Sequence, residues 1–227
     1  MKIVPISVQW ITGTPFPEHV IERCGRICYQ SDHKVVPCRH PHHEGSLPPP
    51  CPNCGDFNSN SAEAFVGKIL KNGHESVLEH VSATLLFTVD RGVTHELVRH
   101  RLCAFSQEST RYCGYSGDRF GGEMTFIEPP GLQEVDRAVW RDTLDTIEGA
   151  YLGMSGNKVT AQIARSILPN ALKADIAVTT NAREWRHICR LRLSPKAHPQ
   201  MIEAMRLAHG HLLQWFPQAF QEFAKGS

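Results

Sequence analysis

Alternating apolar and polar positions predict strands in this chain. Five apolar residues between positions 81 and 89 alternate with mostly polar neighbours, which is the period of a strand with one buried face. Those residues are Val81, Ala83, Leu85, Phe87 and Val89. The apolar stretch from Ile3 to Ile11 predicts a first strand, although Pro5 interrupts it. Shorter strands are expected at residues 124–127 and around residues 176–178.

Apolar residues that recur every three to five positions predict helices over much of the remaining chain. Asn60 followed by Glu63 resembles a capping box, and the apolar face after it ends at Gly73. Pro169 stops one predicted helix, and Pro217 should kink or split another. The predicted helices cover residues 17–29, 60–73, 93–102, 132–151, 158–167, 182–191 and 198–223.

The order of these elements predicts the fold class. Strands and helices alternate without a clean βαβ repeat, which favours an α+β (mixed α/β) domain spanning residues 1–227, with a central twisted sheet flanked by helices. One segment, about residues 31–60, departs in composition because it is rich in Pro, Cys and His. Its prolines exclude a helix interior or a central strand, so we expect a long loop or an inserted knob there.

Composition and charge exclude several classes of protein. The chain has 227 residues, of which 41% are hydrophobic and 21% charged, so neither a disordered nor a fibrous chain fits. A formal net charge of +1 excludes an overall basic nucleic-acid binder. No apolar run approaches the roughly 18 residues that a membrane helix needs. We therefore expect a globular, cytoplasmic protein with no membrane or nucleic-acid partner.

The insert carries a candidate zinc site. Cys51 and Cys54 form a C-x2-C pair followed by glycine, and Cys38 with a nearby histidine offers further ligands. The histidines are His40, His42 and His43. Without a secretory signal, an even number of cysteines does not imply disulfides. The alternative to a structural zinc is a reduced loop rich in proline and histidine.

Three polar segments outside the insert are candidates for chemistry. In the first, Arg99, His100 and Arg101 precede a Ser/Thr-rich run that ends near Arg111, and guanidinium forks with hydroxyl donors suit phosphate or carboxylate recognition. The second, residues 74–80, holds two histidines six residues apart, which is not the spacing of a two-histidine metal site on a helix. Each segment alone is equally compatible with a solvated polar surface.

The third segment, residues 181–192, is rich in nitrogen donors. Asn181 occupies a position typical of a helix N-cap, and Arg183, His187 and Arg190 share one face of the helix that follows. So many donors on one short helix suit a ligand with phosphates. A charged surface helix is the ordinary alternative.

In combination and order, these segments resemble the flavin-dependent thymidylate synthase (ThyX) family. The sequence Arg99-His100-Arg101, then seven residues and Ser109, is similar to the family signature RHR-x7-S. The segment from His74 to His80 resembles the upstream H-E-[ST]-x-x-E-H motif. Further similarity lies at residues 164–169 and 181–192, and the whole covers roughly residues 17–30 and 60–215.

This resemblance implies a homotetramer, an obligate oligomer, in which several subunits build each active site. It implies FAD as cofactor, NADPH and methylenetetrahydrofolate as co-substrates, and methylation of dUMP at C5 to give dTMP. The positions that match flavin-binding residues are Ser76, Arg99, His100, Arg101, Gln107, Asn181, Arg183 and His187. Those that match the dUMP site are Glu96, Arg99, Gln107, Glu108, Ser109, Thr110, Arg111, Arg165 and Arg192.

Two matched residues carry more specific roles. Arg192 matches the arginine that activates the uracil, and His74 matches a histidine close to the flavin and the folate. The chemistry agrees, because a fixed guanidinium stabilises negative charge that develops on the uracil ring. Ser109 has no histidine or lysine base beside it in the sequence, so we expect it to bind substrate without a covalent step.

Three departures from the family pattern leave the substrate open. Glu96 stands where glutamine is frequent, His187 where asparagine is frequent, and Lys196-Ala197-His198 replaces His-Ala-Gln. A relative that acts on UMP or another pyrimidine nucleotide is the same-fold alternative. A nucleic-acid-binding module with a zinc knuckle is the alternative from another class.

Overall fold

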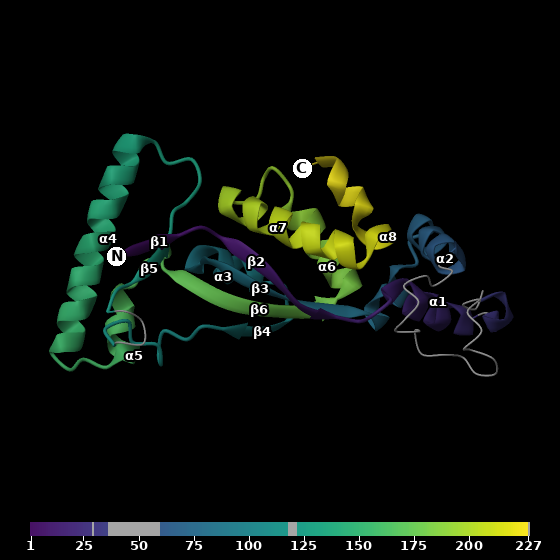
Figure 1. The fold of residues 1–227 in the computed structure, drawn as a ribbon, viewed down its shortest axis with the longest axis horizontal. Helices are drawn as coiled ribbons and strands as arrows, with labels where there is room; N and C mark the ends of the chain where they lie inside the picture. Colours follow the sequence, from purple (N-terminus) through teal and green to yellow (C-terminus); the bar gives the residue numbers. More distant parts are fainter. Residues whose placement is uncertain (29, 36–59, 118–121, 227) are drawn as a thin grey trace, which may run out of the picture.

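The computed structural model describes residues 1–28, 30–35, 60–117 and 122–226 (Figure 1). Most of the predicted insert therefore lies outside the described residues, and so do the zinc-ligand candidates Cys38, Cys51 and Cys54. The side chain of Asn60 is outside them as well, so the predicted capping box with Glu63 stays a prediction. Five described cysteines, which are Cys24, Cys28, Cys103, Cys113 and Cys189, carry free thiols.

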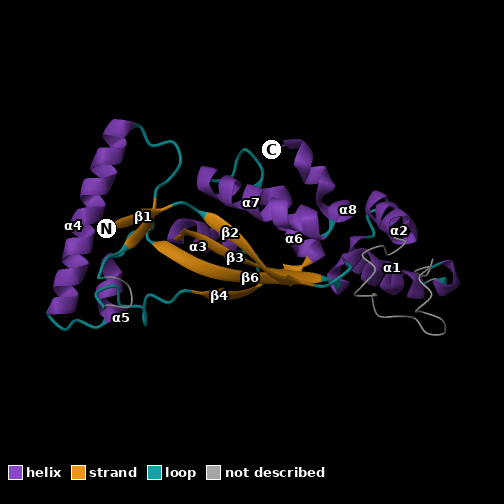
Figure 2. Cartoon of the chain, viewed as in Figure 1, coloured by secondary structure: helices purple, strands orange, loops and turns teal. Residues whose placement is uncertain are grey.

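A four-stranded antiparallel sheet forms the centre of the molecule (Figure 2). Its strands lie in the order β2-β3-β6-β4. A separate pair, β1 and β5, is parallel. The strand bounds are Lys2–Val4 (β1), Ser7–Gly13 (β2), Ser82–Asp90 (β3), Ala104–Gln107 (β4), Thr125–Ile127 (β5) and Lys173–Asn181 (β6). The predicted mixed α/β class is confirmed.

The alternation along β3 and β6 decides which face of the sheet is covered. Ala83, Leu85 and Phe87 of β3 are buried on the same side as Ile176 and Val178 of β6. The intervening positions are more polar, and there the Thr84 and Thr179 hydroxyls lie 2.8 Å apart. One face of the sheet is therefore the core face, as the two-residue period predicts.

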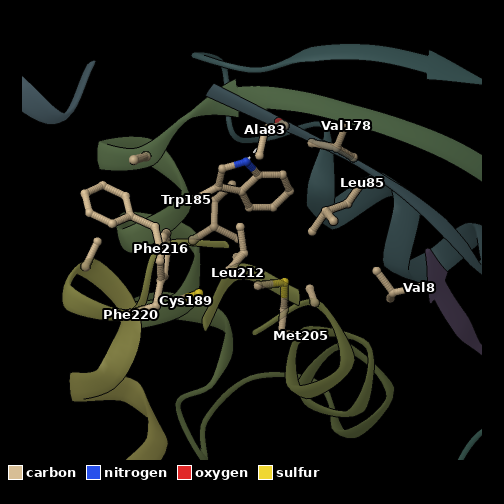
Figure 3. Packing of buried hydrophobic residues seen from close by; sticks show 14 of the residues in the cluster. Val8, Ala83, Leu85, Val178, Trp185, Cys189, Met205, Leu212, Phe216 and Phe220 are labelled. Carbon is tan, nitrogen blue, oxygen red and sulfur yellow. Dashed lines mark hydrogen bonds between the residues drawn. The ribbon is translucent and has the colours of Figure 1, made fainter. Parts of the chain in front are cut away.

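Helices α6 (Ala182–Arg192), α7 (Pro199–Trp215) and α8 (Pro217–Phe220) cover the core face. Trp185 lies at the centre of this packing, fully buried, and its indole N–H donates to the Ala83 carbonyl at 3.1 Å (Figure 3). Met205, Leu212 and Phe216 belong to the same cluster. This burial holds α6 firmly against the sheet, and α6 carries part of the site described below.

The two ends of the sheet carry different helices (Figure 1). Helices α1 (Pro17–Ile27) and α2 (Asn60–Lys71) pack together at one end, next to a 3-10 helix, Glu75–His80. At the other end lie α4 (Glu134–Gly156) and α5 (Ala161–Ala164), where Leu144 and Tyr151 pack against Met124 and Phe126. Among the residues described here, no helix is both long and apolar enough to span a bilayer.

Three boundary predictions were wrong. Pro5 divides the expected first strand into β1 and β2. The helix expected at residues 93–102 is α3 (Arg91–Leu97), which Asp90 caps by accepting from the Val93 N–H at 2.7 Å. The helix expected at 158–167 reduces to α5 and a 3-10 turn, Arg165–Ile167. By contrast, the predicted break at Pro217 is confirmed.

Candidate functional site

Helix α6 begins and ends at residues of the candidate site. Asn181, the last residue of β6, caps the helix through its side-chain oxygen, which accepts from the Glu184 N–H at 2.9 Å. Ala182, Trp185 and Ile188 are buried and fix the helix against the sheet. Arg192, the last residue of α6, is thereby presented beside the end of α3.

Arg192 uses all three of its nitrogens inside the chain. Its Nη1 donates to a Glu96 carboxylate oxygen at 2.6 Å, and its Nη2 donates to the Glu96 carbonyl at 3.1 Å. Its Nε donates to His100 Nε2 at 3.1 Å. The Arg192 side chain is 19% exposed, whereas that of Glu96 is 37% exposed. The guanidinium is therefore fixed in a partly dry position, with its two terminal nitrogens toward the more exposed partner.

His100 is the buried member of this group. Burial, followed by the charges of Arg192 and His187, lowers the pKa of His100 from 6.5 to about 4, so the imidazole is neutral near pH 7. Its other ring nitrogen, Nδ1, lies 3.4 Å from a carboxylate oxygen of Glu184. The His187 ring stands edge-on to it, with ring centroids 5.9 Å apart.

An open cleft of about 440 Å³ lies beside His100, Glu184 and His187. Its lining consists of Arg99, His100, Arg101, Leu102, Glu184 and His187. Ligand atoms of His100, Glu184 and His187 lie within 4.8 Å of one another, a spacing that a metal ion tolerates. However, an arginine N–H already occupies His100 Nε2, and two further arginines line the cleft. The arrangement therefore suits an anionic ligand better than a cation.

Gln107 and Glu108 follow the cleft-lining residues in the sequence, and they lie beside Ile176 and Asp175 in the first half of β6. Gln107, in β4, donates to the Thr94 hydroxyl at 3.0 Å. The Glu108 N–H donates to the Asp175 carbonyl, and its carboxylate accepts from Lys173 at 2.8 Å. The Tyr115 hydroxyl also donates to the Glu108 carboxylate, at 3.2 Å. The Glu108 side chain is thus held by partners within the chain, beside a cavity of about 260 Å³.

The Ser/Thr-rich run forms a tight turn after Glu108. The Ser109 carbonyl accepts from the Cys113 N–H at 2.9 Å, and its hydroxyl accepts from the Arg111 N–H at 3.3 Å. Thr110 is buried, whereas Arg111 is exposed and lies over the Tyr112 ring at 5.5 Å. Ser109 makes no hydrogen bond to a histidine or lysine within the described part of the chain. A serine nucleophile would need such a base.

A third set of matched residues lies near the opposite end of β6. His74 and Ser76 are exposed beside or within the 3-10 helix Glu75–His80. Arg183, in the first turn of α6, donates to the Glu79 carboxylate at 2.5 Å, and both side chains are about half exposed. Arg165, by contrast, is exposed in the 3-10 turn that follows α5, at the end of the sheet where α4 and α5 lie.

The predicted site residues do not all meet within one chain. Glu108 lies beside Asp175, near the start of β6, whereas Arg183 follows Asn181 at its end. Asn181 lies six residue steps along the extended strand from Asp175, which corresponds to about 20 Å. The structure therefore brings Glu96, His100, His187 and Arg192 together but keeps the Glu108–Arg111 turn apart from Ser76 and Arg183.

Two buried charged residues, Glu184 and Arg186, were not predicted from the sequence. Glu184 was not predicted as a site residue, yet it lines the cleft and is 7% exposed. Arg186 is 2% exposed, and its Nη2 donates to Glu75 at 3.0 Å and to Glu222 at 2.9 Å. Helical spacing was a usable signal for Arg186, because it lies four positions after buried Ala182 on the same face of the helix.

Comparisons with known proteins give one family. The Thy1 family model, described as "Thymidylate synthase complementing protein", matches residues 9–218. A flavin-dependent thymidylate synthase from Geobacter sulfurreducens is 33% identical over 213 residues, covering 90% of this chain and 83% of the relative. One from Mycobacterium avium is 32% identical over 218 residues, covering 91% and 78%.

The fold is also similar to a solved structure. Thymidylate synthase X from Helicobacter pylori, crystallised with FAD and dUMP, superposes with a TM-score of 0.70. The match covers 96% of this chain and 98% of the other at 19% sequence identity, a level that supports similarity of fold.

Proposed function

The chain belongs to the flavin-dependent thymidylate synthase family, and from this premise we propose that it methylates dUMP at C5 to give dTMP, with Arg192 polarising the uracil. Methylenetetrahydrofolate serves as the carbon donor, and NADPH-reduced FAD as the reductant. Five free thiols among the described cysteines support a cytoplasmic location.

The arrangement of Arg192 is the observation that carries this proposal. Uracil C5 is a poor nucleophile until negative charge develops on the ring at N3 and O4. A guanidinium held on three sides by Glu96 and His100 is already oriented, so it stabilises that charge without reorganising. Its terminal nitrogens lie on the side of Glu96, the more exposed partner, which is where a substrate can reach them.

The residues of the cleft fit a flavin dinucleotide. Arg99, Arg101 and His187 are exposed donors around it, and guanidinium forks match the oxygens of a pyrophosphate. We propose that these residues, with His100, Ser76, Gln107, Asn181 and Arg183, hold FAD. When bound, the flavin supplies the reducing electrons, and the protein groups bind and orient the reactants. His74 is proposed to lie next to the flavin and the folate.

The separation of the matched residues supports an oligomeric site. We propose that Glu108, Ser109, Thr110, Arg111 and Arg165 of one subunit contribute to the dUMP site together with Arg192 of another. About 20 Å along β6 separates the Glu108–Arg111 turn from Ser76 and Arg183, so one chain does not bring all the matched residues into one site alone. A homotetramer, an obligate oligomer, with shared active sites resolves this separation. The domain is proposed to span residues 1–227, interrupted by the insert.

Ser109 is assigned to substrate binding. Its hydroxyl accepts a hydrogen bond from the backbone within its own turn, and the described residues supply it with no basic partner. An exposed Arg111 beside it provides a cation for a phosphate. The turn therefore binds an anion, and no covalent enzyme nucleophile is proposed.

A tritium-release assay tests the proposed reaction. Methylation at C5 removes the hydrogen at that carbon, so dUMP labelled with tritium at C5 should release it to water. We expect release that requires FAD, NADPH and methylenetetrahydrofolate together, with UMP labelled in the same way as the comparison. Tritium release from UMP and not from dUMP would show that the substrate is the ribonucleotide. Binding of nucleic acid by a protein that binds no flavin would favour the zinc-knuckle alternative.

A further inference from the structure

Glu184 is a buried acidic residue for which the proposed reaction has no role so far. It lies in the first turn of α6, its backbone N–H is capped by Asn181, and its side chain is 9% exposed. A buried carboxylate is costly unless it faces a partner. The nearest partner is His100, whose Nδ1 lies 3.4 Å from a Glu184 oxygen.

The hydrogen bond from Arg192 shows which ring nitrogen of the His100 imidazole carries the proton. An arginine N–H is always a donor, so His100 Nε2, at 3.1 Å from Arg192 Nε, must accept. A neutral histidine that accepts at Nε2 carries its proton on Nδ1. The nitrogen that carries this proton lies 3.4 Å from a carboxylate oxygen of Glu184. The three side chains therefore form a directed chain from carboxylate to imidazole to guanidinium.

We propose that Glu184 is a positioning residue, which holds His100 in the Nδ1–H tautomer and through it keeps Arg192 aligned for substrate. This inference rests on the proposed function of Arg192. Loss of the carboxylate leaves the tautomer free to change, and an Nε2–H would meet the Arg192 Nε–H donor to donor. The guanidinium would then lose its buried support.

The two supports of Arg192 differ in a way that suits this role. Glu96 holds the terminal nitrogens and is 37% exposed, so a substrate can share or displace it. His100 holds Nε and is 5% exposed, so its contact persists when the terminal nitrogens change partner. The contact between His100 and Arg192 Nε therefore sets the orientation of the guanidinium, and Glu184 sets the tautomer of His100.

Burial and the charges of Arg192 and His187 favour a neutral His100 ring, whereas a carboxylate at Glu184 favours the charged form. Arg192 and His187 face it from α6, Arg99 and Arg101 flank it in its own segment, and Glu184 is the acidic group that approaches it. The lowered pKa of His100, caused first by burial, agrees with this picture. A neutral ring is required for acceptance at Nε2.

Three variants separate positioning from simple stability. Glu184→Gln keeps an oxygen that can accept from Nδ1–H, Glu184→Leu removes it at similar size, and Glu128→Gln is the matched control. Glu128 pairs with Arg137 at 2.6 Å, outside the proposed site. We expect kcat for dTMP, per bound flavin, to fall about tenfold to a hundredfold in the Leu variant. The kcat of Glu184→Gln should stay within about fivefold of the wild-type value. The kcat of the control, Glu128→Gln, should equal that of the wild type.

A measurement of the tautomer in the protein without flavin provides a readout independent of activity. Protein labelled with 15N in its histidines shows, by long-range proton–nitrogen correlation, which ring nitrogen carries the proton, and His100→Gln assigns the signal. We expect Nδ1–H near pH 7 in the wild type and a shift toward Nε2–H in Glu184→Leu. An imidazolium or an Nε2–H ring in the wild type overturns the proposal, as does an unchanged tautomer with unchanged kcat in the Leu variant.

Failure of the proposed function remains distinguishable from failure of this inference. If the wild type binds FAD but forms no dTMP, the proposed reaction is wrong. The tautomer comparison then decides alone whether Glu184 holds His100. If the wild type is active and Glu184→Leu is equally active, the role of Glu184 is wrong and the reaction stands.

Discussion

Replacing Arg192 by alanine separates catalysis from folding, because the structure places its main ionic partner near solvent. The Glu96 carboxylate is 37% exposed, so removing the guanidinium does not strand a buried charge. An ion pair this exposed contributes about 0–1 kcal/mol. Loss of the His100 hydrogen bond adds about 1 kcal/mol. A total near 2 kcal/mol is tolerable for a domain of ordinary stability, roughly 5–15 kcal/mol.

The cost to the reaction should be much larger than the cost to folding. Removing one preoriented group that stabilises developing charge lowers kcat by about 10²–10³, or about 3–4 kcal/mol in the barrier. The assay is dTMP formation per bound flavin, with flavin absorbance and a urea unfolding curve measured on the same preparation. Arg192→Ala should stay yellow and folded while turnover falls by at least about a hundredfold. Turnover within about threefold of the wild type would refute the role of Arg192.

Three other predictions concern separate parts of the chain. Ser109→Ala should keep measurable dTMP formation, because the hydroxyl binds and does not attack; complete loss with unchanged dUMP affinity would argue for a nucleophile. Arg186→Met should lower the free energy of unfolding by about 2–4 kcal/mol in urea titrations, because it removes the buried partner of Glu75 and Glu222; an unchanged midpoint contradicts this. The pKa of His100 is about 4 in the folded chain and 6.5 ordinarily. Between pH 4 and pH 6.5 the unfolded chain therefore binds a proton at His100 that the folded chain does not bind. The contribution of His100 to stability is therefore full above pH 6.5 and lost toward pH 4, and His100→Gln should flatten that part of the pH dependence.

Elements with strong periodicity were predictable from the sequence. The alternation through Leu85 and Phe87 gave β3 because every second side chain enters the core, which is a local property of a strand. Asn181 was recognised as an N-cap, and its side chain does accept the Glu184 N–H. Pro217 cannot continue a regular helix, and α7 ends at Trp215 just before it.

Elements that depend on partners far along the chain were not predictable. β4 (Ala104–Gln107) has no clear alternation, and it forms because β6 pairs with it. The preceding helix ends at Leu97, since His100 turns inward to meet Arg192 and Glu184, 92 and 84 positions away in sequence. A charged triplet alone does not show that its middle residue is buried and neutral.

The same distinction holds for the candidate site. The resemblance to the family selected Arg192, His100 and Glu96, and the structure places Arg192 in contact with the other two. Glu184 carries no such signature, and its relation to His100 is visible only when α6 packs beside the end of α3.

The measurement that tests the central claim most directly is mass spectrometry of the products formed from equal concentrations of dUMP and UMP. The purified protein would be supplied with FAD, NADPH and methylenetetrahydrofolate, with Arg192→Ala as the parallel sample. The account predicts dTMP from the wild type, little or none from the variant, and no methylated UMP. A flavin-bound wild-type protein that methylates neither nucleotide, or a variant that forms dTMP as fast as the wild type, would contradict it.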